Sequence, residues 1–223
     1  MAQEKENMYE VYFEWYLNAL KSVGLVKEYV KEPESCIVLP PFTIHSSVHM
    51  VRKASKIASH DIMKMATYTR DYDALVHRSL LETLFGVIKK EDGIYILHET
   101  IPKTKGDAFY DFSYYYLFNP AENNEDFVKV SFDVKPPAKA LQFSGSLGSS
   151  REFPYNQKLM LEKHNILVNK VVPVGNSNSL FAKTFTPDRY FYTDGGRPGR
   201  KINFKTKTLE EWMREKGLVK IEI

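Results

Sequence analysis

The segment 127–135, FVKVSFDVK, most constrains what this chain can fold into. Its apolar residues occupy every second position, which is the period of a half-buried β-strand. The apolar face comprises Val128, Val130, Phe132 and Val134, and the polar face comprises Lys129, Ser131, Asp133 and Lys135. Asp133 and Lys135 would project the same way, roughly 7 Å apart, and such a pair can hold a metal ion and orient a water. The pattern also fits an edge strand with a solvated polar face and a weak surface ion pair.

Two further acids lie in a second strand-like run, residues 68–76, YTRDYDALV. Asp71 and Asp73 share parity with Leu75, so we expect at least one of them on a face that is otherwise packed. A buried carboxylate is costly without a partner, and a metal ion or a lysine would compensate it. The alternative is a turn, in which Asp is common.

The first helix is predicted over residues 6–23, with Gly24 ending it. Glu10 is the one charged member of an apolar helical stripe, and the others are Phe13, Leu17, Leu20 and Gly24. A carboxylate near a helix start also suits the helix dipole. Glu10 is therefore a candidate site residue or a carboxylate that stabilises the start of the helix.

Together these features resemble the PD-(D/E)XK nuclease superfamily, of the phage and mobile-element type. Its pattern is a helix bearing Glu, a strand ending in Asp, and a strand carrying an acid, any residue and Lys. Glu10, Asp71 and the run from Asp133 to Lys135 match these parts in order. The opening residues, including the spacing of Glu10, Phe13 and Tyr16, are similar to phage members as well.

The resemblance covers roughly residues 6–175 and implies an α/β, restriction-endonuclease-like fold with a central mixed β-sheet flanked by helices. It implies that Asp71, Asp133 and the Val134 carbonyl ligate Mg²⁺, with Mn²⁺ as a substitute, and that Glu10 completes the site directly or through water. Lys135 would orient a water or stabilise the transition state. Gln157 and Lys158, in a predicted helix-then-strand segment 153–172, would face the site and contact phosphate.

Two residues depart from the superfamily pattern. Arg70 stands where members often have Pro, and Pro136 follows the lysine where Gly is common. These departures favour the alternative of a nucleic-acid-binding protein that keeps the fold without the chemistry.

We divide the chain into a nuclease-like core, residues 1–178, and a C-terminal basic loop and helix, residues 179–223, packed on it. An insertion of about residues 77–125 lengthens the core. Within it, segments 84–88 and 94–97 flank Asp92 and Gly93, a strong hairpin signal. The aromatic segment 109–118 is predicted to be another strand, or to stack on unpaired bases. Thr208 and Glu211 predict a capping box for a last helix that Gly217 ends.

Composition excludes several classes of protein. A single cysteine among 223 residues rules out a disulfide framework and a cysteine-based zinc site. Without a long apolar run or a signal-like N-terminus, we expect no membrane association and a cytoplasmic location, in a bacterium or a phage-infected host. Six histidines offer no metal-ligand spacing beyond His45 and His49.

The formal net charge is only +3, so the distribution of basic residues matters more than their number. One group lies in a predicted helix over residues 46–65, and another lies near the C-terminus around the loop 194–199. The candidate nucleic-acid contacts among all basic residues are Lys53, Lys56, Arg151, Arg189, Arg197 and Arg200, besides Lys158. Segment 145–150 is predicted to be a mobile loop near the site. An ordinary solvated surface is the alternative for both groups.

The predicted function is a metal-dependent DNA endonuclease in phage-type recombination, replication or repair. A Holliday-junction resolvase is the leading hypothesis, and a transposon-end or restriction-type endonuclease is the alternative within the class. The expected partners are DNA, a second copy of the chain in a homodimer, and other recombination or transposition proteins.

Overall fold

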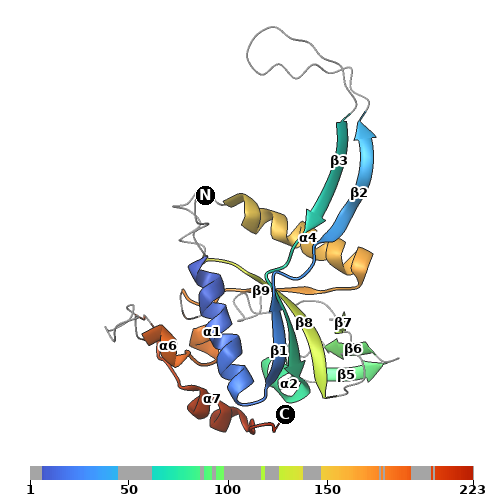
Figure 1. Cartoon of the computed structure of the whole chain (residues 1–223). Helices are drawn as coiled ribbons and strands as arrows, with labels where there is room; N and C mark the ends of the chain where they lie inside the picture. Colours follow the sequence, from blue (N-terminus) through green and yellow to red (C-terminus); the bar gives the residue numbers. More distant parts are fainter. Residues whose placement is uncertain are drawn as a thin grey trace.

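The computed structural model describes residues 7–44, 62–85, 88–91, 94–97, 117–118, 126–137, 147–175, 177, 179–191, 202 and 204–222. Side chains of 44, 62–64, 84–85, 88–91, 94–97, 117–118 and 147–151 lie outside that description. The molecule is mixed α/β, with a mixed central sheet flanked by helices (Figure 1). This confirms the predicted α/β class with a mixed central sheet flanked by helices, while the restriction-endonuclease-like fold stays a prediction.

The central sheet has four strands in the order β1-β4-β8-β9. They are β1 (Val26–Lys31), β4 (Tyr72–His77), β8 (Phe127–Val134) and β9 (Val168–Val171). The first three pair antiparallel, and β9 pairs parallel to β8. A parallel neighbour requires a crossover connection, which here contains helix α4 (Leu147–His164).

The predicted apolar face of β8 is confirmed, but the strand is buried on both faces instead of half-buried, and its central position excludes the edge-strand alternative. Val128, Val130 and Val134 are at most 1% exposed. The polar residues Ser131 and Asp133 are also buried, because β8 is paired on both sides and covered on both faces. Polar groups at these positions are therefore in the protein interior, where their partners determine their chemistry.

Helix α1 (Met8–Ser22) covers one face of the sheet, and its predicted apolar stripe is confirmed. Phe13 is 1% exposed and lies edge-on to the rings of Tyr72 and Phe132, which are register partners on β4 and β8. The Asn7 side chain caps the helix start, and Gly24 follows its end with φ of +77°.

Helix α4 covers the opposite face. Val168 of β9 is paired with Ser131, whose side chain alternates with that of Phe132. Val168 packs with Phe153 and Met160 of α4 in a second apolar cluster. The helix begins at Leu147, so residues 147–150 are not the mobile loop that the sequence suggested.

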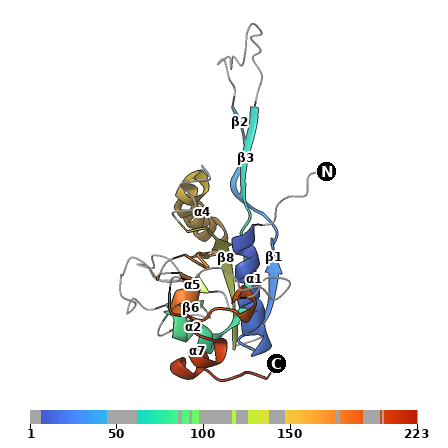
Figure 2. The same ribbon diagram turned by 90° about the vertical axis from the view of Figure 1, so that its left-hand side faces the viewer.

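A two-stranded antiparallel ribbon is inserted between β1 and β4. It consists of β2 (Cys36–Ile44) and β3 (Ile62–Tyr68), and it projects away from the body in both views (Figures 1 and 2). Val38 anchors its base on α4. The predicted helix over 46–65 is wrong at its end, because residues 62–65 belong to β3; the rest of it lies outside the described residues.

The insertion after β4 begins with α2 (Arg78–Phe85). Strands β5 (Ile88–Glu91) and β6 (Ile94–Leu97) form the predicted hairpin around residues 92–93, and β7 (Leu117–Phe118) pairs with β6. The predicted first strand, 84–88, is wrong in its first two residues, which end α2. Of the predicted strand 109–118, the structure describes only β7.

His77 ends β4 beside this insertion. Its Nδ1 is 2.8 Å from Ser79 Oγ, and its ring lies edge-on to Phe127. Burial lowers the pKa of His77, against the opposing charges of Asp126 and Glu82. The imidazole is thus held toward its neutral form.

The C-terminal region comprises α5 (Leu180–Lys183), α6 (Asp188–Phe191) and α7 (Leu209–Lys216). Trp212 is fully buried, 5.5 Å from the Phe185 ring, and both belong to the main core. The capping box of Thr208 with Glu211 is present, as predicted. Among the described residues, no helix has the length and apolar character needed to span a membrane.

Candidate functional site

The candidate site lies where β4 begins and β8 ends. The predicted strand over 68–76 is confirmed for residues 72–76, which belong to β4. It is wrong for residues 68–71: β3 ends at Tyr68, and Asp71 lies in the bend directly before β4, as the turn alternative had it. The Asp71 backbone N–H donates to Phe132 O at 3.0 Å, and the Val134 N–H donates to Asp71 Oδ2 at 2.6 Å. Two acids that are 62 positions apart in the sequence, Asp71 and Asp133, are thereby held at adjacent strand ends.

Asp133 is held between a lysine and a tyrosine. It is 2% exposed, and Lys135 Nζ lies 2.5 Å from its Oδ1. That approach is an ion pair without the alignment of a hydrogen bond, so Oδ1 has no aligned donor. The Tyr68 hydroxyl donates to the other oxygen, Oδ2. Burial and the Asp133 charge both raise the pKa of Tyr68, which keeps it a hydrogen-bond donor.

The charge of Asp133 also acts on the Asp71 carboxyl. Burial, and next the charge of Asp133, raise the pKa of Asp71 from 3.8 to about 8. The Val134 N–H opposes this rise, Glu10 adds to it, and Lys135 opposes it. Crowding of carboxylates that raises a pKa is typical of functional sites, and a cation placed among them would relieve the repulsion.

Glu10 acts on the site electrostatically, because its charge raises the pKa of Asp71. It stands in the first turn of α1, where Asn7 Nδ2 donates to its Oε1 at 2.7 Å. The Tyr72 hydroxyl donates to the Glu10 backbone carbonyl at 3.1 Å, which fixes this turn against β4. The helix start and the strand that follows Asp71 are thus joined directly.

The oxygen donors suit a divalent cation only in part. Among the described residues, no three side chains of the Asp, Glu, His or Cys type are grouped so as to hold a metal ion. Mg²⁺, however, commonly binds through one or two carboxylates and keeps several waters. Asp71 and Asp133 supply that number. The Val134 carbonyl points to the same side as its N–H, toward Asp71, since both groups of a strand residue face one neighbour.

The acid on the packed face of β4 is Asp73, whose carboxylate is paired with Arg70 and, as one of the predicted alternatives had it, with a lysine, Lys129. The Arg70 guanidinium donates twice to the Asp73 carboxylate, Nε to Oδ1 at 2.6 Å and Nη2 to Oδ2 at 2.5 Å. Ser131 Oγ donates to Oδ1 at 2.6 Å, and Lys129 Nζ lies 3.2 Å from Oδ2. Burial opposes ionisation, but the hydrogen bonds from Arg70 and Ser131 prevail and lower the pKa of Asp73.

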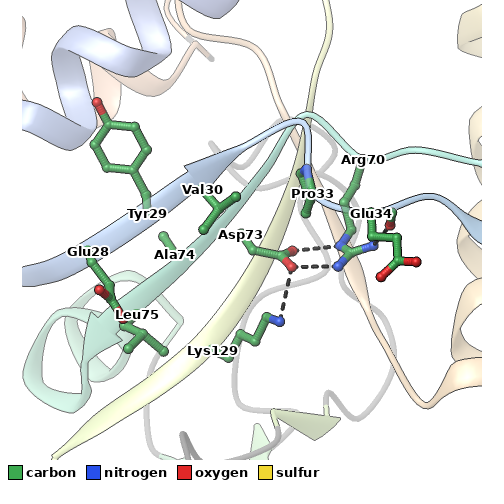
Figure 3. Close-up of a pocket in the computed structure, with 10 residues that line it drawn as sticks. All are labelled: Glu28, Tyr29, Val30, Pro33, Glu34, Arg70, Asp73, Ala74, Leu75 and Lys129. Carbon is green, nitrogen blue, oxygen red and sulfur yellow. Dashed lines mark hydrogen bonds and ion pairs between the residues drawn. The ribbon is translucent and has the colours of Figure 1, made fainter.

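This network borders a cavity of about 370 Å³ beside β1 and β4 (Figure 3). Arg70 also donates to the Glu34 backbone carbonyl at 3.1 Å. The lining residues are Glu28, Tyr29, Val30, Pro33, Glu34, Arg70, Asp73, Ala74, Leu75 and Lys129. Arg70, Asp73 and Lys129 are already paired with one another, and these ion pairs stabilise the start of β4, the strand that follows Asp71.

The predicted nucleic-acid contacts are dispersed. Gln157 Nε2 donates to the Val168 backbone carbonyl at 2.7 Å, so its amide faces β9, while Lys158 is exposed. The Arg189 guanidinium lies 5.1 Å from the centre of the Trp15 ring, on the α1 side. Arg151 lies in α4, but its side chain is outside the described part of the structure. Four other candidates lie entirely outside it: Lys53, Lys56, Arg197 and Arg200.

Sequence patterns missed two residues at the site. Tyr68 contacts Asp133 from 65 positions away. Lys170 of β9 is the register partner of Asp133, and the charges of Lys135 and Asp133 both act on it. Residues 168–171, VNKV, do not alternate between apolar and polar residues, and no local spacing encodes the register of Lys170 with β8.

No family model matches the chain, and no curated protein or solved structure is significantly similar to it. The geometry of the site is therefore the basis for any statement about function.

Proposed function

We propose that the chain is a Mg²⁺-dependent DNA endonuclease with a restriction-endonuclease-like fold, of the PD-(D/E)XK type. One observation carries the proposal. Asp71, Asp133 and Lys135 meet at one end of β4 and β8, and their charges act on one another, with Glu10 contributing from α1. The elements follow the order of the resemblance, a helix with Glu, then an Asp beside a strand, then a strand with acid-x-Lys, with the difference that Asp71 precedes β4 instead of ending a strand.

Each residue has a distinct part in the proposed chemistry. Asp71, Asp133 and the Val134 carbonyl would hold Mg²⁺, and Glu10 would complete its shell directly or through water. When bound, the ion would lower the pKa of a water and polarise the scissile phosphate. Lys135 would donate a hydrogen bond to the attacking water or to a phosphate oxygen in the transition state. Tyr68 would fix the orientation of Asp133.

The identity of the DNA substrate is a separate part of the proposal. We favour a four-way junction, cut by a homodimer whose two sites make symmetric incisions. Transposon ends or specific duplex sequences are the competing substrates. A protein that binds nucleic acid without cutting it is the alternative outside the class, and the presence of Arg70 and Pro136 motivates it.

The decisive experiment is cleavage of labelled four-way junction, splayed-arm, linear duplex and single-stranded DNA in Mg²⁺, Mn²⁺ or EDTA. Asp133→Asn keeps the shape of the side chain and should abolish cleavage. Asp188→Asn is the matched control, because Asp188 is an exposed aspartate at the start of α6 and no described contact joins it to Asp71, Asp133 or Lys135. Thermal unfolding of each variant verifies that the fold is intact.

Metal-dependent cleavage that Asp133→Asn removes and Asp188→Asn retains would support the nuclease. Equal cleavage by Asp133→Asn would exclude the proposed site, and binding of DNA without cleavage by the unaltered protein would favour the non-catalytic alternative. Mg²⁺ should also stabilise the unaltered protein, by about 2.7 kcal/mol at one hundred times its Kd, and should not stabilise Asp133→Asn.

A further inference from the structure

The ribbon of β2 and β3 exposes apolar side chains and carries almost no charge. Of the nine residues of β2 and the seven of β3, only Lys64 is charged. Four large apolar side chains of the ribbon are 43–54% exposed: Ile37, Leu39, Phe42 and Met65. Exposed strands of soluble proteins usually carry charges, and a two-stranded ribbon alone is only marginally stable in water. These properties are typical of a surface that a partner covers.

The base of the ribbon lies at the candidate site. Tyr68, the last residue of β3, donates to Asp133, and the ribbon projects from there in both views (Figures 1 and 2). Residues of a strand rise about 3.3 Å each, so Met65 stands roughly 10 Å from Tyr68 along the ribbon. Phe42, the register partner of Lys64, stands about one residue further out. Nucleotides in one strand of a duplex are about 3.4 Å apart. A nucleic acid that ran along the ribbon from a phosphate at Asp133 would thus place its third or fourth nucleotide beside Met65 and Phe42.

Charge favours a nucleic acid over a second copy of the chain as this partner. The segment that connects the two strands, residues 45–61, has three basic residues and one acidic residue in its sequence: Arg52, Lys53, Lys56 and Asp61. A second copy would present the same net positive charge, whereas a polyanionic backbone complements it. Neither strand of the ribbon contains an acid that would repel phosphate.

We propose that the ribbon binds unstacked bases at the branch point of a branched DNA, through Phe42 and Met65. This inference rests on the proposed function, because it names the substrate class of the same site. Phe and Met are among the residue types that enter between bases, and an aromatic ring stacks on a base of any sequence. Base faces are open where the stack is interrupted, as at a branch point. A continuous duplex offers no such faces to apolar side chains.

The test is binding of the four-way junction, splayed-arm and linear duplex DNA by Phe42→Ser in the full chain, with Ca²⁺ in place of Mg²⁺. Met65→Ser is the second variant, and Phe42→Tyr retains a ring. Phe42 and Met65 belong to neither apolar cluster of the core, so the body should stay folded, which thermal unfolding verifies. Val219→Ser is the matched control, because Val219 is 67% exposed and the segment after α7 lies at the end of the molecule opposite the ribbon in both views.

The Kd of Phe42→Ser for the two branched forms should rise at least about fivefold, the loss typical of one stacked base. Its Kd for linear duplex should not change. The slope of log affinity against log salt concentration, between about 50 and 200 mM, should also stay the same, because an apolar contact releases no counterions. Met65→Ser should act in the same direction, and Phe42→Tyr and Val219→Ser should retain the affinity.

Unchanged affinity of both serine variants for branched DNA, or an equal loss for all DNA forms, would overturn the inference, even if Asp133→Asn abolishes cleavage. A flatter salt slope in Phe42→Ser would also overturn it, as would sedimentation showing that Phe42→Ser turns a dimer into a monomer, since a second copy would then cover the ribbon. The expected losses in a protein that never cleaves would support the ribbon site and overturn the proposed nuclease. Absence of DNA binding by the unaltered protein would overturn both.

Discussion

The Arg70–Asp73 ion pair should be among the largest single contributions to the stability of this fold. Both side chains are nearly inaccessible, 6% and 5% exposed, and joined by two short hydrogen bonds. Removing one partner of such a pair leaves an uncompensated buried charge and costs about 3–5 kcal/mol. Arg70→Met and Asp73→Leu should therefore each destabilise by about that amount.

The double variant should be far less damaged than the sum of its parts. Replacing both partners by apolar residues removes the unpaired charge, so a coupling energy of at least about 2 kcal/mol is expected between them. Lys129→Met is the matched control, because Lys129 contacts the same carboxylate but is half exposed. It should cost about 1 kcal/mol or less.

Urea denaturation measures these values through the fluorescence of the buried Trp212. For a chain of this length, a loss of 4 kcal/mol corresponds to a fall in Tm of about 8–16 °C. A coupling energy below 1 kcal/mol, or a Lys129→Met loss as large as that of Arg70→Met, would refute the argument. The pair would then contribute little net stability despite its burial.

Three other predictions concern positions outside the site. The stability that His77 contributes should fall as the pH drops below about 6.5, because the unfolded chain protonates His77 before the fold does. Asp71, whose pKa is raised, acts in the opposite sense, so the test is the difference in stability between the unaltered protein and His77→Gln: it should decrease between pH 7 and 5, and an unchanged difference would contradict this. Gly24→Ala should cost at least about 2 kcal/mol by denaturation, since φ is +77° and a Cβ would lie 2.0 Å from Ile221 O; a smaller loss would show that the C-terminus yields easily. Thr208→Ala should lower stability by about 1 kcal/mol through loss of the helix cap, with Thr208→Ser restoring it.

Local periodicity predicted the elements whose signals are complete within a few residues. Strand β8, helix α1 and the α7 capping box were placed from the sequence alone, because alternation, an apolar stripe and a cap are short-range patterns. The β5–β6 hairpin followed from its turn residues in the same way. Its boundary with α2 did not, since an apolar run of that length suits either a helix or a strand.

The parts that depend on distant residues were not predictable. Segment 36–44 contains two consecutive prolines and no polar alternation, so it lacked the pattern of a strand. At least one of Asp71 and Asp73 was expected on a packed face with a metal or lysine partner. Asp73 has the lysine, Lys129, but the two hydrogen bonds from Arg70, three residues earlier, were not predicted. The contacts of Asp133 with Tyr68 and Lys170 follow from sheet register, which no local spacing encodes.

The ribbon of β2 and β3 leaves and rejoins the sheet at nearly one point. The Glu32 N–H donates to Asp71 O at 2.8 Å, and Cys36 is paired with Tyr68 just beyond. The chain is therefore closed at the base of the ribbon, and the register of β1 with β4 does not depend on how far the ribbon extends. The ribbon could therefore differ in length beyond its base without disturbing the sheet. Its base is held at several points, by Val38 on α4, by His164 Nε2 at 3.0 Å from Ile37 O and by the Tyr68 hydroxyl on Asp133, so a change in ribbon length would leave the position of Asp133 unaltered.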